Sequence, residues 1–189
     1  MRPLPRSFFA RSAEVVAREL LGARIRSRST LTRLSGIITE TEAYLGRDDP
    51  ASHAYRGRRH DGNASLYLAP GTWYVYRSYG VHWCANLVCG NPAAGSAVLL
   101  RGLLPVEGLG LMRRRRRGRP DPELTNGPGK LCQALGITRE LDGQPMWRSE
   151  FVVAETKAEP PGVLVTTPRI GITKAVDWPL RYLLSSPRP

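Results

Sequence analysis

The sequence is poor in cysteine and in long apolar stretches, and each shortage excludes a class of protein. Its three cysteines, Cys84, Cys89 and Cys132, are an odd number with a spacing that matches no zinc motif, so we expect packed thiols in a reduced compartment. No apolar run approaches the ~20 residues that cross a bilayer, so nothing is expected to span a membrane. Residues 1–10 contain arginine but lack the apolar stretch of a signal peptide. We therefore expect an intracellular protein, in the bacterial cytoplasm or nucleoid.

Acidic residues are scarce relative to basic ones, which leaves a formal net charge of +12 and a pI near 10.5. Such a balance indicates a polyanionic partner, either DNA, RNA or an anionic membrane. No basic amphipathic helix is apparent, so a nucleic acid is the better candidate. Only Lys130, Lys157 and Lys174 among the 28 basic residues are lysine. GC-rich codons explain the preference for arginine, but not the excess of basic over acidic residues.

What is present predicts one α+β domain over residues 1–189, with a largely antiparallel sheet and few helices. The 189 residues are 41% hydrophobic, enough for a core without disulfides or a structural metal, and no repeat or long linker divides them. Helices are expected at residues 12–21, with Ser12 as N-cap, and at 107–117 and 130–135. Strands are expected at residues 23–26, 34–44, 73–77, 81–89, 97–104, 151–155, 162–167 and 180–184, with polar loops at 47–63 and 119–123.

Two carboxylates alternate along the second expected strand. The two-residue period of a strand puts Glu40, Glu42 and Tyr44 on one face. If both glutamates are partly desolvated, their repulsion raises one pKa and leaves a base poised to act. The alternative is an exposed edge strand with solvated glutamates, and these residues alone favour it.

An aromatic residue stands at the tip of the expected hairpin between residues 73–77 and 81–89. Tyr79 lies beside Gly80 in the turn, with Tyr76 and His82 on the two arms. A large exposed aromatic on a basic protein indicates a wedge that enters a stack of bases. Equally, the tip could fold back so that Tyr79 is merely packed.

An arginine interrupts the apolar strand at residues 97–104. The Arg101 guanidinium needs a partner there, and Glu40, Glu42 or a bound anion could supply it. Alternatively, the pleat of the strand points Arg101 at solvent.

Gly127-Pro128-Gly129-Lys130 opens the helix expected at residues 130–135. Free backbone N–H groups and a lysine at a helix start can bind a phosphate. The same residues could form only a tight turn.

Two further groups of residues are weaker signals. His53, His60 and Asp61 match no standard metal site, so no metal is expected. The arginine run, residues 113–117, is expected to be a solvated patch that attracts DNA without reading its sequence.

Taken together, these segments resemble the alkyladenine (3-methyladenine, or methylpurine) DNA glycosylase family. The matching residues occur in family order and cover nearly the whole chain, which is more specific than any single motif. They are residues 40–46 (ETEAYLG), 51–53 (ASH), 70–76 (PGTWYVY), 79–86 (YGVHWCAN), 98–101 (VLLR), 124–135 (LTNGPGKLCQAL) and 168–172 (PRIGI).

The resemblance implies a role for each of several residues. Glu42 would be the general base that activates the attacking water, and Arg101 and the backbone carbonyl of Ile170 would help to hold that water. The remaining implied site residues fall into two groups: Tyr44, His53, Tyr76 and Asn86 would line the pocket for the flipped purine, with Asn86 at its floor, and Tyr79, Val81, His82, Gly129 and Lys130 would contact DNA, with Tyr79 filling the hole left in the duplex.

The resemblance also implies the fold, the reaction and the partners. The family fold is a single α+β domain with a curved antiparallel sheet, flanking helices and a protruding hairpin. The enzyme would flip alkylated or deaminated purines (3-methyladenine, 7-methylguanine, hypoxanthine or ethenoadenine) out of duplex DNA from the minor groove, hydrolyse the N-glycosidic bond and leave an abasic site. We expect a monomer without a cofactor. None of the three lysines belongs to the expected catalytic or pocket residues, although Lys174 comes four residues after Ile170, so a Schiff base is not expected. A non-catalytic nucleic-acid-binding module that stacks bases on the hairpin is the alternative.

The chain departs from the family pattern in two places. Residues 59–63 (RHDGN) replace the usual Thr-Pro-Arg-Asn run and keep only Asn63, which affects the expected contacts to the DNA backbone. Val81 stands where the family often has a bulky residue beside the wedge.

Overall fold

The strands form one antiparallel sheet in a computed structural model that describes residues 2–155 and 162–185. They are β1 (Arg24–Ser27), β2 (Ser35–Tyr44), β3 (Trp73–Ser78), β4 (His82–Cys89), β5 (Ser96–Glu107), β6 (Phe151–Ala154), β7 (Val163–Thr167) and β8 (Arg181–Ser185). The order is β3-β4-β5-β2-β1-β6, while β8 pairs with β2 and β7 with β8. Every pairing is antiparallel, which confirms the expected fold class.

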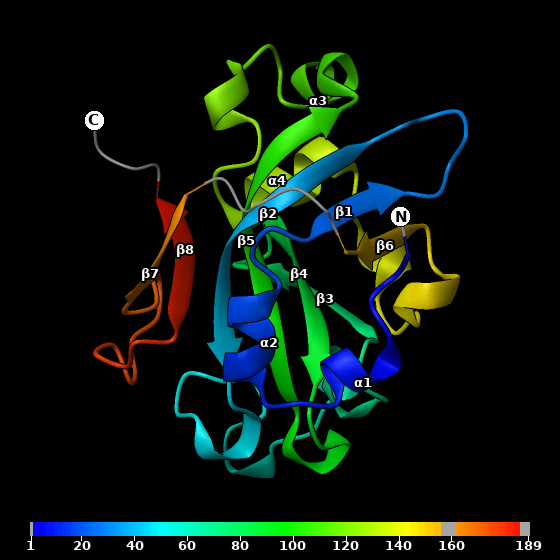
Figure 1. Ribbon diagram of the computed structural model, residues 1–189. Helices are drawn as coiled ribbons and strands as arrows, with labels where there is room; N and C mark the ends of the chain where they lie inside the picture. The colour runs from blue at the N-terminus through cyan, green and yellow to red at the C-terminus, as the bar shows by residue number, and fades with distance from the viewer. Residues whose placement is uncertain (1, 156–161, 186–189) are drawn as a thin grey trace.

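The two longest strands, β2 and β5, pair along the length of β2 in the middle of the sheet (Figure 1). The other edge of β2 is shared, because its first half pairs with β1 and its second half with β8. Register shifts on both sides of Glu40 mark the place where the partner changes, and such bulges bend a strand and re-aim its side chains. β2 is therefore a central strand, and the alternative of an exposed edge strand is wrong.

Short helices flank the sheet: α1 (Arg6–Phe9), α2 (Ala13–Glu19), α3 (Leu109–Arg115) and α4 (Pro128–Leu135). The Ser12 hydroxyl accepts a hydrogen bond from the N–H of Val15, so the expected N-cap of α2 is confirmed. α2 lies against β2 and β5 (Figure 1), where the Thr41 hydroxyl donates to the Ala17 carbonyl oxygen at 2.8 Å. Apolar side chains of the helices and the sheet form the core, among them Val16, Leu20, Ile25, Leu87, Leu100 and Leu131.

The border between β5 and α3 differs most from the expected one. Glu107, expected to start the helix, still belongs to β5, where its carboxylate accepts hydrogen bonds from Arg24 (2.6 Å) and Ser35 (2.8 Å). Gly108, with a φ of 81°, then turns the chain into α3, which begins at Leu109. Polar contacts to distant strands therefore extend β5 beyond its apolar run.

Other boundaries agree more closely. The remaining strands lie within one residue of the expected ranges. α4 begins at Pro128, two residues early, because proline suits the first turn of a helix. α1 is absent from the sequence-based prediction. The expected loop at 47–63 is irregular, with short 3₁₀ turns at Gly46–Asp48 and Tyr55–Gly57 and the start of a third, Asp61–Tyr67.

The hairpin of β3 and β4 closes through residues 79–81, between the paired Ser78 and His82. The N–H of Val81 donates to the Ser78 carbonyl oxygen at 3.0 Å, and both central residues have positive φ, 49° at Tyr79 and 67° at Gly80. Positive φ at both positions is the signature of a type I′ turn, which matches the twist of the two strands. The expected hairpin and its tight turn are confirmed.

The three cysteines are buried and unpaired, as the odd number and spacing predict. Within residues 2–155 and 162–185, none of the helices is both long and apolar enough to cross a membrane.

Candidate active site

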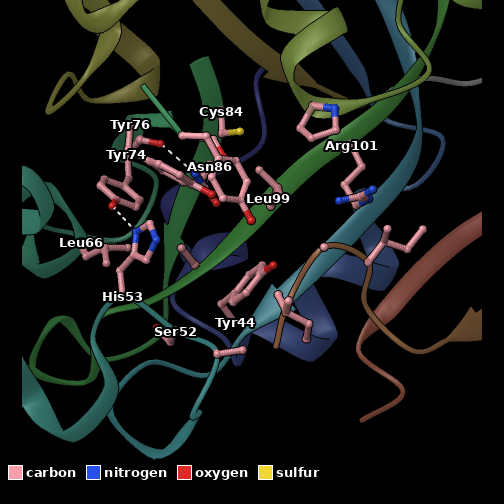
Figure 2. Close-up of a pocket in the computed structure, with 18 of the residues that line it drawn as sticks. Tyr44, Ser52, His53, Leu66, Tyr74, Tyr76, Cys84, Asn86, Leu99 and Arg101 are labelled. Atoms are coloured by element: carbon pink, nitrogen blue, oxygen red, sulfur yellow. Dashed lines mark hydrogen bonds between the residues drawn. The ribbon is translucent and has the colours of Figure 1, made fainter. Parts of the chain in front are cut away.

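A cavity of about 660 Å³ lies between the middle of the sheet and three neighbouring segments. The base of the β3–β4 hairpin, the loop after β2 and the segment after β7 each supply part of its wall. Figure 2 shows Tyr44, His53, Tyr76, Asn86 and Arg101 around this space, so the structure brings together residues from five segments of the sequence. Their roles stay predictions.

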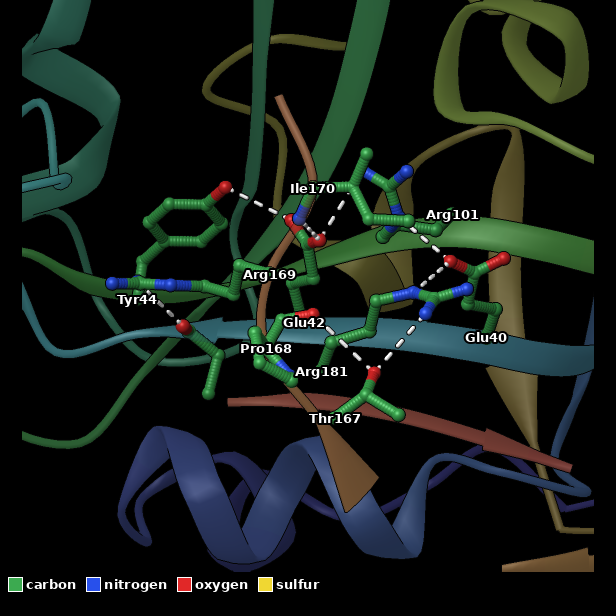
Figure 3. Close-up of polar contacts among 10 residues, drawn as sticks. Glu40, Glu42, Tyr44, Arg101, Thr167, Pro168, Arg169, Ile170 and Arg181 are labelled. Carbon is green, nitrogen blue, oxygen red and sulfur yellow. Dashed lines mark hydrogen bonds and ion pairs between the residues drawn. The ribbon is translucent and has the colours of Figure 1, made fainter. Parts of the chain in front are cut away.

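The Glu42 carboxylate lies directly behind the wall of the cavity and is fully buried. It accepts hydrogen bonds from the Tyr44 hydroxyl (2.9 Å) and from the backbone N–H of Ile170 (2.8 Å), and it lies 3.4 Å from an Arg101 nitrogen (Figure 3). Burial raises the pKa of Glu42, although Arg101 and the two hydrogen bonds oppose the rise. A carboxylate with a raised pKa beside a cavity suits a general base.

Glu40 differs from Glu42 although only Thr41 separates them. Its carboxylate accepts hydrogen bonds from Arg101 (2.8 Å) and Arg181 (2.6 Å) (Figure 3). Burial would raise the pKa of Glu40, but the two arginines together outweigh burial and lower it. Glu40 therefore stays ionised and fixes arginines, whereas Glu42 is the carboxylate suited to accept a proton.

Arg101 joins the two carboxylates. It contacts both Glu40 and Glu42, and its side chain is only 12% exposed, so the expected carboxylate pairing is confirmed and the solvent-facing alternative is wrong. Arg101 also lines the cavity, which puts a positive charge at its wall.

Aromatic rings form one side of the cavity. His53 lies edge-on to Tyr76 with ring centroids 4.5 Å apart, and Tyr76 stacks on Tyr74 at 5.3 Å. The His53 Nδ1 atom is 2.7 Å from the Tyr74 hydroxyl (Figure 2), which fixes the imidazole ring. Burial lowers the pKa of His53, so the ring is neutral at pH 7. Tyr74 is absent from the expected site residues, although its alternation with Tyr76 along β3 is a signal for it.

Two asparagines hold the parts of this wall. The Asn86 side-chain nitrogen donates to the Tyr74 carbonyl oxygen at 3.1 Å, so the amide that lines the cavity has a fixed orientation. Buried Asn63 donates to the carbonyl oxygens of His53 and Arg58, both at 3.0 Å. The one residue that the 59–63 segment keeps from the family pattern therefore shapes the loop that carries His53.

The hairpin tip forms the rim of the cavity. Tyr79 lines it and is 91% exposed, so the alternative in which the tip packs Tyr79 against the domain is wrong. Val81 is also exposed, at 63%. A Cβ atom at Gly129 would lie only 2.8 Å from the Cβ atom of His82, so a glycine lets α4 approach the hairpin this closely.

Two lysines, Lys130 and Lys174, lie near the expected site. The Lys130 ammonium donates to the Asn126 side-chain oxygen at 2.8 Å and is exposed, and its expected phosphate contact stays a prediction. Lys174 lines the cavity, with its ammonium 6.0 Å from the centre of the Tyr55 ring. Residues 170–174 all line the cavity, so the lysine expected to be nearest a site element does reach the cavity wall, and water as the nucleophile stays a prediction.

The arginine run is more than a solvated patch. Arg113 donates twice to Asp121 at 2.7 Å, and half-buried Arg115 donates to the Leu135 carbonyl oxygen at 2.6 Å. Arginine at the end of a helix satisfies its free carbonyl groups. Part of the run therefore holds α3 against the end of α4.

A buried ion pair behind Tyr44 is absent from the sequence-based prediction. Arg169 donates to both carboxylate oxygens of Asp49, and both side chains are fully buried. The two residues are 120 positions apart, so spacing gives no signal for their contact.

No group of three or more potential metal ligands occurs within the residues that the structure describes.

The comparisons with known proteins agree with one another. The sequence profile of the methylpurine-DNA glycosylase family matches residues 7–188. Proteins named "putative 3-methyladenine DNA glycosylase" are 48% identical over 179 residues in Agrobacterium fabrum, covering 95% of this chain and 87% of the relative, and 47% identical over 190 residues in Methanoculleus marisnigri, covering 98% and 96%. A third relative of that name, from Rhodopseudomonas palustris strain HaA2, is 46% identical over 186 residues, covering 98% of this chain and 89% of its own.

The family match over nearly the whole chain defines the class of the protein as a base-excising enzyme. The chain belongs to the methylpurine-DNA glycosylase family and is a DNA glycosylase, a hydrolase of N-glycosyl bonds. This excludes a non-catalytic binding module.

Proposed function

We propose that the enzyme flips alkylated or deaminated purines out of duplex DNA and hydrolyses their N-glycosidic bond with a water activated by Glu42. The observation that carries this proposal is the buried Glu42 carboxylate, whose three partners Tyr44, Arg101 and Ile170 all line the cavity. The 3-methyladenine, 7-methylguanine, hypoxanthine and ethenoadenine bases are the substrates we expect, in a single glycosylase domain formed by residues 1–189.

The chemistry needs a negative charge close to the sugar. The N-glycosidic bond breaks through an oxocarbenium-like sugar, which a nearby carboxylate stabilises while it takes a proton from the attacking water. The Tyr44 hydroxyl and the Ile170 N–H each occupy one acceptor site of the Glu42 carboxylate, which has about four, so a site remains for the attacking water. The N–H of Ile170 already binds Glu42, and we expect the Ile170 carbonyl and Arg101 to hold the water.

The flipped purine would stack among the rings of Tyr44, His53 and Tyr76, with Asn86 screening its substituents. The ring separations of 4.5 and 5.3 Å within this wall are typical of favourable aromatic contacts. A purine methylated on N3 or N7 carries a positive charge and leaves as a neutral base without acid help. Hypoxanthine is neutral, so it must take up one proton as it leaves, and the proton that Glu42 takes from the attacking water would supply it.

Tyr79 would fill the space left in the duplex, entered from the minor groove. A tyrosine at positive φ carries backbone strain, which often marks a functional position. Val81, His82, Gly129 and Lys130 would contact the DNA backbone, and the net charge of +12 would supply attraction that is independent of sequence. The enzyme would act as a monomer on DNA in the cytoplasm or nucleoid.

A single-turnover assay tests the proposal. Duplexes with one hypoxanthine or one 7-methylguanine should release that base, while a matched undamaged duplex should release none. Glu42→Gln keeps the shape of the side chain and should bind the damaged duplex without releasing the base. Equal release by the variant and the wild type would exclude Glu42 as the base and point to Glu40.

A further inference from the structure

The buried pair of Asp49 and Arg169 links three parts of the site. Arg169 donates to Asp49 and to the Ala43 carbonyl oxygen at 3.1 Å, so it attaches the segment after β7 to the end of β2. Asp49 also accepts the backbone N–H groups of Leu45 and Ala51, at 3.1 and 3.0 Å. The pair thereby holds Arg169 in place next to Ile170, whose backbone N–H donates to Glu42.

The guanidinium of Arg169 also covers one side of the Tyr44 ring. Its central carbon lies 4.7 Å from the ring centre, a cation–π distance, and Figure 3 shows the side chain next to the ring. Arg169 is not part of the cavity wall, whereas Tyr44 is. A base that stacks on Tyr44 from the cavity would therefore have a positive charge on the far side of the same ring.

Stability alone does not account for this arrangement. A buried ion pair rarely stabilises a protein more than apolar side chains of the same size, because both charges lose their water. The Nε–H group of Arg169 is buried and has no hydrogen-bond partner among the residues described, which adds a further cost. Glu42 and Arg101 also lie near the Tyr44 ring, so charges of both signs surround it and the loss of one changes the net charge there.

We propose that Asp49 and Arg169 are positioning residues that set the preference of the enzyme between cationic and neutral damaged bases. This inference rests on the proposed function. Asp49 neutralises the charge behind Tyr44, so the ring can stack on a positively charged purine. Without Asp49, the free guanidinium repels a cationic base through the ring. Without Arg169, the free Asp49 carboxylate attracts the cationic base.

The test is a competition between 7-methylguanine, which is cationic, and hypoxanthine, which is neutral, in two duplexes of equal sequence in one reaction. The ratio of the two release rates is independent of how much enzyme is active. Asp49→Asn should lower the ratio for 7-methylguanine over hypoxanthine about 10-fold, and Arg169→Gln should raise it by about the same factor. The double variant D49N/R169Q, which removes both charges, should return the ratio to within ~2-fold of the wild type.

Asp121→Asn is the matched control, because it removes the same charge from an exposed pair with Arg113 and should leave the ratio unchanged. A folding defect lowers both rates together and cannot shift the ratio in opposite directions in the two single variants. If either single variant folds and releases base with an unchanged ratio, or if both shift it the same way, the inference is wrong. If the wild type releases neither base, the proposed function itself is wrong.

Discussion

The carboxylate site and the hairpin tip are opposite in almost every physical respect. Around Glu42, charges are buried, paired and fixed by contacts of 2.6–3.4 Å from β5, β8 and the segment after β7. At the tip, Tyr79 is 91% exposed on a turn with positive φ. The difference suits the function proposed above, in which the chemistry needs groups that do not move and entry into a duplex needs a side chain that meets the DNA first. Changes in one region should therefore leave the other intact.

The largest expected effect comes from separating the two glutamates of β2. Glu42→Gln should lower the single-turnover rate of base release by ~10³-fold or more, since the amide cannot take a proton. Glu40→Gln should lower it much less, because it weakens the hold on Arg101 and Arg181 without removing the base. Binding to damaged duplex, measured in parallel, should change little in either variant. If Glu40→Gln lowers the rate of base release more than Glu42→Gln does, Glu40 rather than Glu42 is the general base.

The complementary change removes the ring at the tip. Tyr79→Ala should weaken capture of a damaged base in duplex DNA by ~10–100-fold, because flipping costs a few kcal/mol that the inserted ring offsets. Single-stranded substrate, which has no stack to refill, should lose little. Thermal stability should stay the same, since the ring contributes little burial. Leu31→Ala, which removes an exposed apolar side chain (93%) outside the hairpin, is the control. Equal losses on single and double strands would show that Tyr79 does not refill the stack of bases.

A smaller effect should appear in the pH profile. Burial raises the pKa of Glu42, so release should fall as the pH drops through a value above the ordinary 4.5 of glutamate. The Tyr44 hydroxyl favours the ionised form of Glu42, so Tyr44→Phe should raise that pKa further and move the acid limb to higher pH. Single-turnover rates across the acid range measure this. An acid limb that moves to lower pH would mean that water solvates Glu42 better than the hydroxyl does.

The smallest effect concerns the arginine run. Arg114 and Arg117 are both exposed, and the double variant Arg114→Gln with Arg117→Gln should bind undamaged DNA with a weaker dependence on salt. The slope of log K against log salt concentration should become shallower by ~1 for each phosphate that the variant no longer neutralises. The preference among lesions should stay the same. Arg115→Gln should instead lower the melting temperature, because it removes hydrogen bonds to the end of α4. An unchanged slope in the double variant would show that these arginines do not touch DNA.

The sequence predicts the hairpin tip better than the ionic cluster, and the reason is physical. A Ser-Tyr-Gly turn between two aromatic strands is a local signal, and so is the alternation of Glu40, Glu42 and Tyr44. The pairing of Arg101 also follows, since a charge in an apolar strand needs a partner. By contrast, the contact of Asp49 with Arg169 depends on a chain crossing that no local pattern encodes.

The same limit explains two other differences. β8 pairs with the second half of β2, which brings Arg181 to Glu40 from 141 residues away. Likewise, Lys174 reaches the cavity because residues 170–174, which follow β7, all line it. Long-range pairings of this kind place side chains that composition and spacing leave undefined.

The nature of the nucleophile is the central claim, and the presence of Lys174 at the cavity makes its test sharp. Duplex DNA with one damaged purine is incubated with the enzyme in the presence of borohydride, and the DNA product and any protein–DNA adduct are separated. Water as the nucleophile predicts an intact abasic site, no trapped adduct and unchanged chemistry in Lys174→Ala. Strand cleavage without added alkali, with a trapped complex that Lys174→Ala abolishes, would contradict it and make the enzyme a lyase that forms a Schiff base.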